Sequence, residues 1–212
     1  EPYRRQRQMC IRDRERITTM LNRFYVDNII NTALAEDINY IDVTTDNLLQ
    51  DDDVSEAYFV AKDSGILCGI DVAARVFDLA GGNVEKEILL KDGAPIKKGD
   101  YIAFFRGSAK TLLKGERTAL NLIQHMSGIA TAANECVKLV EGTNASIADT
   151  RKTLPGLRAL QKYSVTVGGG KNHRFNLSDG AMLKDNHIDA YGSITGAVSA
   201  LRKKAGHMLK IE

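Results

Sequence analysis

Positive side chains gather between residues 151 and 184 of this chain. Seven lysines and arginines occur there against a single acidic residue, Asp179. Cations that converge on one place repel each other by roughly a few kcal/mol per close pair at an intermediate effective dielectric. Such a cluster is tolerated when an anion occupies it or when acids elsewhere compensate, so we expect a polyanionic ligand carrying phosphates, carboxylates or both. The cations are Arg151, Lys152, Arg158, Lys162, Lys171, Arg174 and Lys184.

Two of the polar clusters in this region directly follow apolar segments. The sequence DTRKT (149–153) follows ASIA, and KDNH (184–187) follows GAML. In α/β barrels the reactive groups lie at the carboxyl ends of the strands, and arginine and lysine there suit carboxylates and phosphates. We therefore predict that Arg151, Lys152 and Lys184 bind the anion.

The remaining cations have competing interpretations. Arg158 and Lys162 lie four residues apart on a predicted helix, which favours a solvated face. Lys171 follows three glycines and suits either a loop surface or a ligand contact. The glycine run is not a Walker A phosphate loop, because no Ser or Thr follows Lys171. His173 by itself would be a structural histidine, but its neighbour Arg174 favours a role in binding.

The first half of the chain predicts a small α+β unit. Its apolar spacing and turn residues indicate helices and short strands in alternation. Asp37, Asp42 and Asp46 are interpreted as turn and capping groups. The predicted elements are a helix over 17–35, a loop over 36–46, two strands within 56–70, a helix over 71–79 with Asp71 as N-cap, and strands within 84–106.

The second half predicts a parallel α/β layer or barrel. Strand and helix patterns alternate there, which is typical of parallel sheets. Because the pattern stops on a strand, we expect the natural protein to be longer. The predicted elements are two helical stretches within 109–141 broken at Ser127-Gly128, strands at 145–150, 180–185 and 208–212, and helices at 157–165 and 193–205, the last with Ser193 as N-cap.

The net charge of the chain is unevenly distributed. Residues 1–16 hold six arginines and three acids, a net charge of +3, so the rest carries −1 of the total of +2. A nucleic-acid-binding domain should be basic over its folded surface, so this composition argues against nucleic acid as a partner. Residues 1–16 also lack helical or strand periodicity, and we expect them to be disordered or non-native.

Neither a membrane span nor a disulfide framework is expected. No run of eighteen apolar residues occurs, as a transmembrane helix would require, and no basic-then-apolar leader opens the chain. Cys10, Cys68 and Cys136 form no Cys-x-x-Cys pair, which favours a reducing cytoplasm. We interpret Cys68 and Cys136 as core residues. The four histidines show no metal-ligand spacing.

Several motifs occur in the order of one enzyme family. From about Ile29 to Glu212 the chain resembles the quinolinate phosphoribosyltransferases, also called carboxylating nicotinate-nucleotide pyrophosphorylases. The stretch ADTRKTLPGLR, followed by KNHR and LKDNH, is very specific. The motifs are ALAEDINYIDVTTD (33–46), AKDSGILCG (61–69), KGERTALNLIQHMSGIAT (114–131), IADTRKTLPGLR (147–158), GGGKNHRFNLSDGAMLKDNHI (168–188) and the start of a Glu-x-Glu strand at Ile211-Glu212.

The resemblance implies an α/β fold of the type II phosphoribosyltransferase kind. An N-terminal α+β sandwich domain would span residues 17–112, and residues 113–212 would form the first part of an incomplete α/β barrel. The family works as a homodimer or an assembly of dimers. Its acidic residues on the metal side are expected beyond Glu212, so no metal ligand is assigned within this chain, and the chain alone is expected to be inactive.

The resemblance also implies which residues bind quinolinate. Its carboxylates would be held by Arg151, Arg174 and Lys184, with His173 beside them and Thr150 in the same segment. Two carboxylates on the ligand agree with the excess of cations found from the residues alone.

The second substrate and the partner subunit would use two further residues. Lys152 would serve phosphoribosyl pyrophosphate, and Arg117 would reach the site of the partner subunit. Lys152 and Lys184 are the expected catalytic residues. Mg²⁺ would accompany the pyrophosphate. The pyridine nitrogen of quinolinate would attack the anomeric carbon as pyrophosphate leaves, and loss of CO₂ would then give nicotinate mononucleotide.

Two alternatives remain open at this stage. One is a phosphoribosyltransferase of the same fold, acting on nicotinate or associated with molybdate uptake. A monocarboxylate needs fewer cations, which favours quinolinate. The other is a non-catalytic protein that binds anions or nucleic acid. That interpretation requires aromatic side chains for base stacking among the cations, and only Tyr163 and Phe175 lie nearby.

Overall fold

The computed structural model describes residues 21–212 and divides them into two compact units. One unit comprises residues 21–149 and 153–171, and the other comprises residues 150–152 and 172–212. The predictions for residues 1–16 and for the start of a helix at Ile17 lie outside the described residues. The predicted domain boundary at 112/113 stays a prediction.

Two helices open the first unit, and side chains cap both. Helix α2 (Arg23–Asp37) begins after Asn22, whose side chain accepts a hydrogen bond from the N–H of Phe24. Helix α3 (Val43–Leu48) lies where the sequence predicted a loop, so that part of the prediction is wrong. It begins because Asp42 Oδ1 accepts hydrogen bonds from the N–H groups of Thr44 and Thr45, an N-cap interaction that stabilises a first helical turn. The capping role of Asp42 is confirmed.

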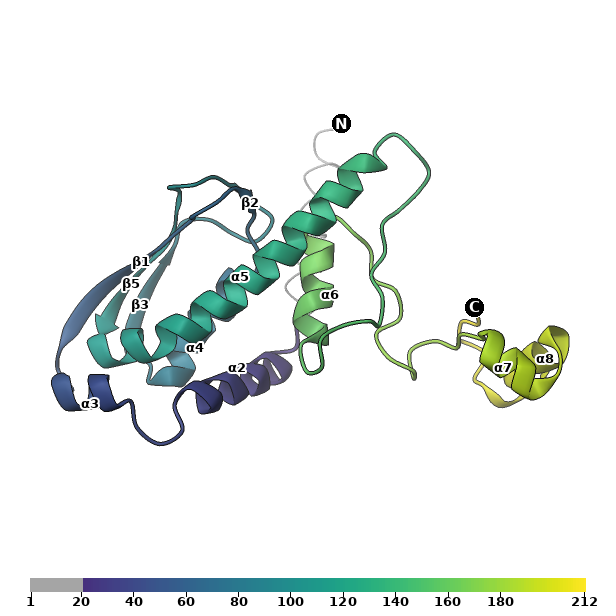
Figure 1. Ribbon diagram of the computed structural model, residues 1–212, viewed down its shortest axis with the longest axis horizontal. Coiled ribbons are helices and arrows are strands. Elements are labelled where there is room, and N and C mark those ends of the chain that lie inside the picture. The colour runs from purple at the N-terminus through teal and green to yellow at the C-terminus, as the bar shows by residue number, and fades with distance from the viewer. Residues whose placement is uncertain (1–20) are drawn as a thin grey trace, which may run out of the picture. The chain divides into compact units, whose positions relative to one another are not determined.

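A three-stranded antiparallel sheet forms the β layer of this unit (Figure 1). Its order is β1-β5-β3, and a separate pair joins β2 to β4. The core on its inner face includes the rings of Phe59, Phe77 and Phe105, whose centroids lie 4.8–6.1 Å apart. The strands are β1 (Val54–Val60), β2 (Gly65–Ile66), β3 (Val84–Ile88), β4 (Pro95–Ile96) and β5 (Tyr101–Ser108).

Helix α4 (Ile70–Ala80) begins differently from the prediction. Its N-cap is Gly69, at a φ of 92°, and Asp71 lies inside the first turn. The first N–H groups are satisfied from outside the helix, because Asp92 Oδ1 accepts hydrogen bonds from Gly69 N at 2.8 Å and Ile70 N at 3.0 Å. A capping residue supplied by a distant loop has no local signature, which is why the sequence indicated the nearby Asp71.

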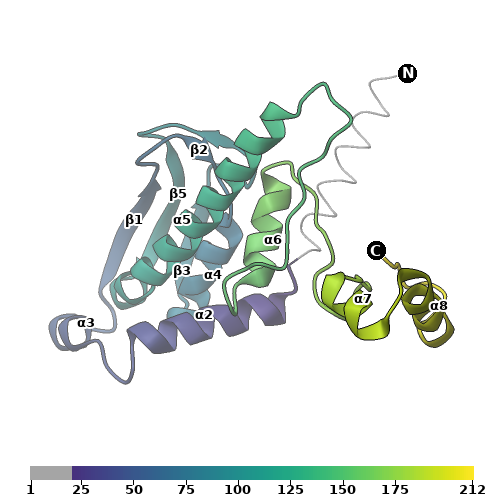
Figure 2. The same ribbon diagram turned by 45° about the vertical axis from the view of Figure 1, so that its right-hand side comes forward.

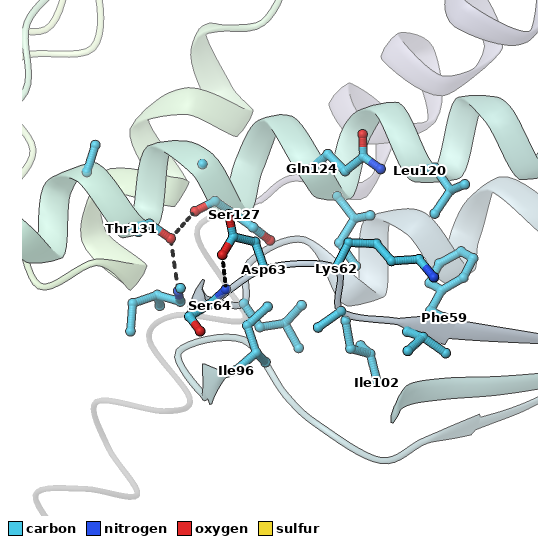
Figure 3. Close-up of a pocket in the computed structure, with 18 of the residues that line it drawn as sticks. Phe59, Lys62, Asp63, Ser64, Ile96, Ile102, Leu120, Gln124, Ser127 and Thr131 are labelled. Atoms are coloured by element: carbon cyan, nitrogen blue, oxygen red, sulfur yellow. Dashed lines mark hydrogen bonds between the residues drawn. The ribbon is translucent and has the colours of Figure 1, made fainter. Parts of the chain in front are cut away.

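Helix α5 (Ala109–Leu139) is continuous, so the predicted break at Ser127-Gly128 is wrong. The Ser127 hydroxyl accepts from Cys68 N and donates to Cys68 O, at 2.9 and 3.1 Å. Thr131 Oγ1 accepts from Ile66 N at 2.9 Å and donates to Ser127 O at 2.8 Å (Figure 3). These small polar residues attach the segment around β2 to the helix without interrupting it.

Helix α6 (Arg158–Val167) confirms the predicted helix and packs against α5 (Figures 1 and 2). The glycine run that follows it has a packing role. A Cβ atom on Gly168 would lie 2.3 Å from Ala130 O, and one on Gly170 would lie 2.7 Å from Val165 Cγ1. Gly169 has a φ of 95°, which favours glycine. The three glycines thus allow the chain to turn closely over α5 and α6.

The second unit contains helices α7 (Asp185–Tyr191) and α8 (Ile194–Lys204). Ser193 caps α8 as predicted, because its hydroxyl accepts from Gly196 N at 3.1 Å. Helix α7 was not predicted. The strand predicted at 145–150 and the pair predicted at 180–185 and 208–212 are reduced to isolated parallel bridges, Ala148↔Lys171 in the first unit and Ala181↔Ile211 in the second. The parallel direction is as expected, but pairing does not continue far enough along the backbone to form strands.

The mixture of helices and sheet confirms the predicted α/β class. Cys68 is buried as expected, whereas Cys136 is exposed on α5, so its assignment to the core is wrong. Among residues 21–212, none of the helices has both the length and the apolar character needed to cross a membrane.

Candidate functional site

The parallel bridge of the second unit brings two of the predicted residues into one local framework. Arg174 is half-buried, and its Nη1 donates a hydrogen bond of 2.8 Å to Gly180 O. Gly180 directly precedes the segment in which Ala181 N donates to Lys210 O and Leu183 N donates to Glu212 O. Lys184 follows Leu183 and is exposed. Arg174 and Lys184 are therefore attached to the two ends of one short segment.

His173 is linked to the other side of the same bridge. Its Nε2 lies 2.9 Å from Glu212 Oε2, while its Nδ1 accepts a hydrogen bond of 2.8 Å from Arg174 N. A ring whose Nδ1 accepts has its proton on Nε2, so His173 donates to the Glu212 carboxylate. The sequence did not assign Glu212 to the site. The signal that could have found it is its place at the end of an apolar segment, where the barrel rule expects functional groups.

The segment Thr150–Lys152 belongs to the second unit with these residues. The Thr150 hydroxyl accepts a hydrogen bond of 2.9 Å from Lys152 N, which shapes a tight turn. Arg151 at the centre of this turn is half-buried, and Lys152 is exposed. At Lys184 the backbone N–H donates to His187 Nδ1 at 3.1 Å. In both places, the backbone N–H of a lysine, Lys152 or Lys184, is hydrogen-bonded to the side chain of a nearby residue.

Two other candidate cations belong to the first unit. Arg117 is exposed on α5. Lys171 is exposed, and its Nζ donates to Ser146 Oγ at 2.9 Å. Its backbone pairs with the segment around Ala148. Lys171 thus lies exposed and bonded to a neighbouring segment of the protein, in agreement with the interpretation as a loop-surface residue.

Lys162 contradicts the solvated face predicted for α6. Its side chain is only 3% exposed, and its Nζ forms an ion pair and a hydrogen bond with Asp149, whose side chain is 5% exposed. Arg158 is half-buried, and its Nε donates to Thr153 Oγ1 at 3.0 Å. The four-residue spacing correctly placed both cations on one side of the helix. That side faces the protein, and the compensating acid is Asp149.

A buried polar cluster anchors α6 in the first unit. Tyr163 Oη donates to Asp92 Oδ2 at 2.8 Å, and the other oxygen of this carboxylate caps α4. Burial raises the pKa of Asp92, although the hydrogen bonds from Ile70, Gly69 and Tyr163 oppose the shift. Burial, with Asp92 beside it, also raises the pKa of Tyr163, and burial raises the pKa of the Cys68 thiol. These shifts belong to a packed interior and leave Cys68 a poor nucleophile.

A pocket of about 510 Å³ lies elsewhere in the first unit, between α5 and the segment around β2 (Figure 3). Its walls include Phe59, Ile96, Ile102 and Leu120, and Lys62 lies on its lining. None of the residues predicted to bind the anion lines it. This mostly apolar space does not match the polyanionic ligand expected from the sequence.

The second unit has the chemical means to hold a dianion. Arginine offers five N–H donors in a planar fork, so the bond from Arg174 to Gly180 leaves further donors for a carboxylate. Lysine adds a mobile charge at exposed positions such as Lys152 and Lys184. Within residues 21–212, no group of three or more His, Cys, Asp and Glu side chains is arranged to hold a metal ion.

Comparison with known proteins identifies the family to which the chain belongs. The model of the quinolinate phosphoribosyl transferase N-terminal domain matches residues 42–127, and that of the C-terminal domain matches residues 129–212. The two models follow each other along most of the chain. The chain belongs to the quinolinate phosphoribosyl transferase family.

Individual relatives agree with this assignment. The chain is 45% identical over 192 residues to the probable nicotinate-nucleotide pyrophosphorylase [carboxylating] of Bacillus subtilis, covering 91% of this chain and 66% of that protein. It is 46% identical to the Mycobacterium leprae nicotinate-nucleotide pyrophosphorylase [carboxylating], covering 83% and 63%. The crystal structure of NadC from Streptococcus pyogenes matches with a TM-score of 0.86 and 40% identity, covering 90% and 68%. The chain thus spans slightly less than two thirds of the length of the first two relatives.

Proposed function

We propose that this protein binds quinolinate and transfers the phosphoribosyl group of phosphoribosyl pyrophosphate to it, forming nicotinate mononucleotide, pyrophosphate and CO₂ in NAD biosynthesis. The observation that carries the proposal is that three predicted residues lie around the parallel bridge Ala181↔Ile211. Arg174 and His173 are hydrogen-bonded to residues next to the bridge, and Lys184 follows it in the chain. Family membership adds support, since the relatives are named carboxylating nicotinate-nucleotide pyrophosphorylases.

Quinolinate binding would depend on charge and geometry together. We assign one carboxylate of the ligand to the arginine forks of Arg151 and Arg174, which can form paired hydrogen bonds. Lys184 would balance the second carboxylate, with His173 beside it and Thr150 in the same binding segment. Lys152 would contact the phosphoribosyl pyrophosphate side. Lys152 and Lys184 are thus the two lysines that we place next to reacting groups.

The proposed reaction proceeds in two bond-breaking steps. The nitrogen lone pair of quinolinate forms a bond to the anomeric carbon as the C–O bond to pyrophosphate breaks, through a transition state with oxocarbenium character as in glycosidic cleavage. The ring then carries a positive charge. The electrons of the bond to the 2-carboxylate move into this ring as CO₂ leaves, and a proton replaces it. A site that stabilises the 2-carboxylate less than it stabilises the transition state for the loss of CO₂ would favour this step.

We propose Mg²⁺ as the cation that accompanies phosphoribosyl pyrophosphate. A hard divalent cation bound to phosphate oxygens neutralises charge on the leaving pyrophosphate. The donor set of the described residues does not form a site of its own for the ion. We therefore assign no residue of this chain as a metal ligand, and no step of the proposal depends on one.

The partner and the compartment are part of the same proposal. Arg117 is exposed on α5, as a residue that contacts a partner subunit's substrate would be, so we propose a homodimer with shared sites. The exposed thiol of Cys136 favours a reducing compartment, and we propose the cytoplasm.

The test is a calorimetric titration of the protein with quinolinate and, separately, with nicotinate. We expect quinolinate to bind more tightly, because nicotinate lacks one carboxylate, the one that we assign to Arg151 and Arg174. Arg151→Leu should abolish the preference for quinolinate. Lys86→Met, which removes an exposed pair with Asp78, is the matched control and should leave it intact. Equal affinity of the unaltered protein for the two acids, or tighter binding of an oligonucleotide, would contradict the proposal.

A further inference from the structure

The ion pair between Lys162 and Asp149 is the most buried pair of opposite charges among the described ion pairs. The two side chains are 3% and 5% exposed, and their charged atoms are in direct contact. Removing two ions from water carries a desolvation penalty that their mutual attraction often fails to offset, so an apolar pair of similar volume is frequently as stable. A contribution to the stability of the fold therefore does not by itself explain why this ion pair is present.

Asp149 is held from two directions. Its carboxylate contacts Lys162, and its backbone N–H donates a hydrogen bond of 3.0 Å to Lys171 O. Lys171 N in turn donates to Ile147 O at 2.8 Å, which completes the parallel bridge. The side-chain contact therefore adds a second constraint to a backbone that is already paired.

Lys162 is itself on a well-anchored helix. Its neighbours Leu160, Tyr163 and Ser164 are buried, and Tyr163 is hydrogen-bonded to Asp92. The ammonium group is therefore fixed relative to the core of the first unit, and so is the carboxylate that it contacts.

We propose that Lys162 is a positioning residue for the quinolinate site and acts through Asp149. Thr150, Arg151 and Lys152 follow Asp149 directly in the chain, so a fixed Asp149 determines where that substrate-binding segment begins. This inference rests on the proposed function, because it assigns the purpose of the pair to the ligand-binding segment. Lys162 does not contact the substrate, since its charged group is buried against Asp149.

The decisive experiment separates positioning from stability. Lys162→Met removes the buried positive charge beside Asp149, and it should lower both the melting temperature and the affinity for quinolinate. Combining Lys162→Met with Asp149→Leu replaces the pair by apolar groups, and it should restore much of the melting temperature. Because a misplacement of about 1 Å can reduce an enzymatic rate by about 100-fold, we expect quinolinate affinity in the double variant to stay about tenfold or more below wild type.

A second readout reports on geometry directly. The ratio of quinolinate to nicotinate affinity should fall in the double variant, because a displaced Arg151 would no longer match the carboxylate that nicotinate lacks. A purely structural role would leave this ratio unchanged in the folded fraction. Lys86→Met again serves as the control, because it breaks an exposed Lys–Asp pair at a site remote in sequence from residues 149–184.

Each outcome has a defined meaning. Wild-type affinity and selectivity in the folded double variant would overturn the positioning role and leave the proposed function intact. If the double variant does not fold, Lys162→Arg keeps the charge but changes the length and shape of the group, and wild-type binding by that variant would overturn the inference. Failure of the unaltered protein to bind quinolinate would overturn both the proposed function and the inference.

Discussion

Lys162 and Lys184 belong to the same cation-rich stretch of sequence, yet the structure treats their charges in opposite ways. Lys162 lies in the first unit, almost fully buried against Asp149. Lys184 lies in the second unit and is exposed at the start of α7. The first unit contains another cation paired with an acid, since Arg75 donates two hydrogen bonds of 2.9 Å to Asp27. These bonds lower the pKa of the Asp27 carboxyl. Internally paired charges maintain the framework, whereas exposed cations of the second unit are available to a ligand.

The largest expected loss of stability tests the buried polar groups of the first unit. Asp92→Ala removes the acceptor for Gly69 N, Ile70 N and Tyr163 Oη. Leaving buried donors without partners should reduce the free energy of unfolding by about 3 kcal/mol. Chemical denaturation monitored by circular dichroism measures the change. A loss below about 0.5 kcal/mol would show that these buried polar groups do not stabilise the first unit.

Two glycine substitutions test how closely the chain packs against α5. Gly168→Ala places a Cβ atom 2.3 Å from Ala130 O, and such overpacking should reduce the free energy of unfolding by about 2 kcal/mol. Gly128→Ala is the matched control inside α5, where no heavy atom lies within 4 Å of the added Cβ. It should stabilise the protein by about 0.5–1 kcal/mol, because alanine favours a helix more than glycine does. Equal melting temperatures for the two variants would contradict the close approach of residue 168 to α5.

The pH dependence of stability tests the ionisation of Asp92. Its pKa is raised in the folded protein, mainly by burial, so the native state binds the proton more tightly than the unfolded state does. The stability that this group contributes is present below its unfolded pKa of about 3.9 and is lost as the pH rises through the folded pKa. Asp92→Asn removes this component. The difference in free energy of unfolding between wild type and Asp92→Asn should therefore change with pH above about 4, to the disadvantage of wild type.

Asp27, Asp42 and Asp46 titrate in the opposite direction, because hydrogen bonds from their neighbours lower their pKa values. The measurement must therefore be the difference between the two proteins at each pH. A constant difference would indicate that Asp92 ionises as it does in the unfolded chain.

The smallest expected effect on stability belongs to the second unit. Lys184→Ala removes an exposed charge and should change the free energy of unfolding by no more than about 0.5 kcal/mol. Under the proposed function, the same variant should lose measurable quinolinate binding, because one carboxylate loses its counter-charge. Thermal unfolding and calorimetric titration of one preparation give both values. A large loss of stability would place Lys184 with the framework charges and erase the contrast with Lys162.

Local chemistry made several features predictable. The caps at Asp42 and Ser193 were correctly assigned because the side chain bonds to N–H groups only a few residues away. The positions of the strands in the first unit followed from short β-prone segments separated by turn residues, whereas their pairing order β1-β5-β3 and β2-β4 did not. Helix α6 was expected from its apolar spacing. The buried side of α6 was not, because residue spacing on a helix does not indicate which side a neighbouring element will cover.

The sequence by itself determined the family, the α/β class and the set of cations that could meet a dicarboxylate, because these depend on residue types and on their order along the chain. Only the tertiary structure decided which of those cations are used internally. Lys162 met Asp149 through the packing of α6, and α4 received its capping carboxylate from the distant Asp92. Both contacts join residues that are separated in sequence, so only the packing of the chain brings the partners together.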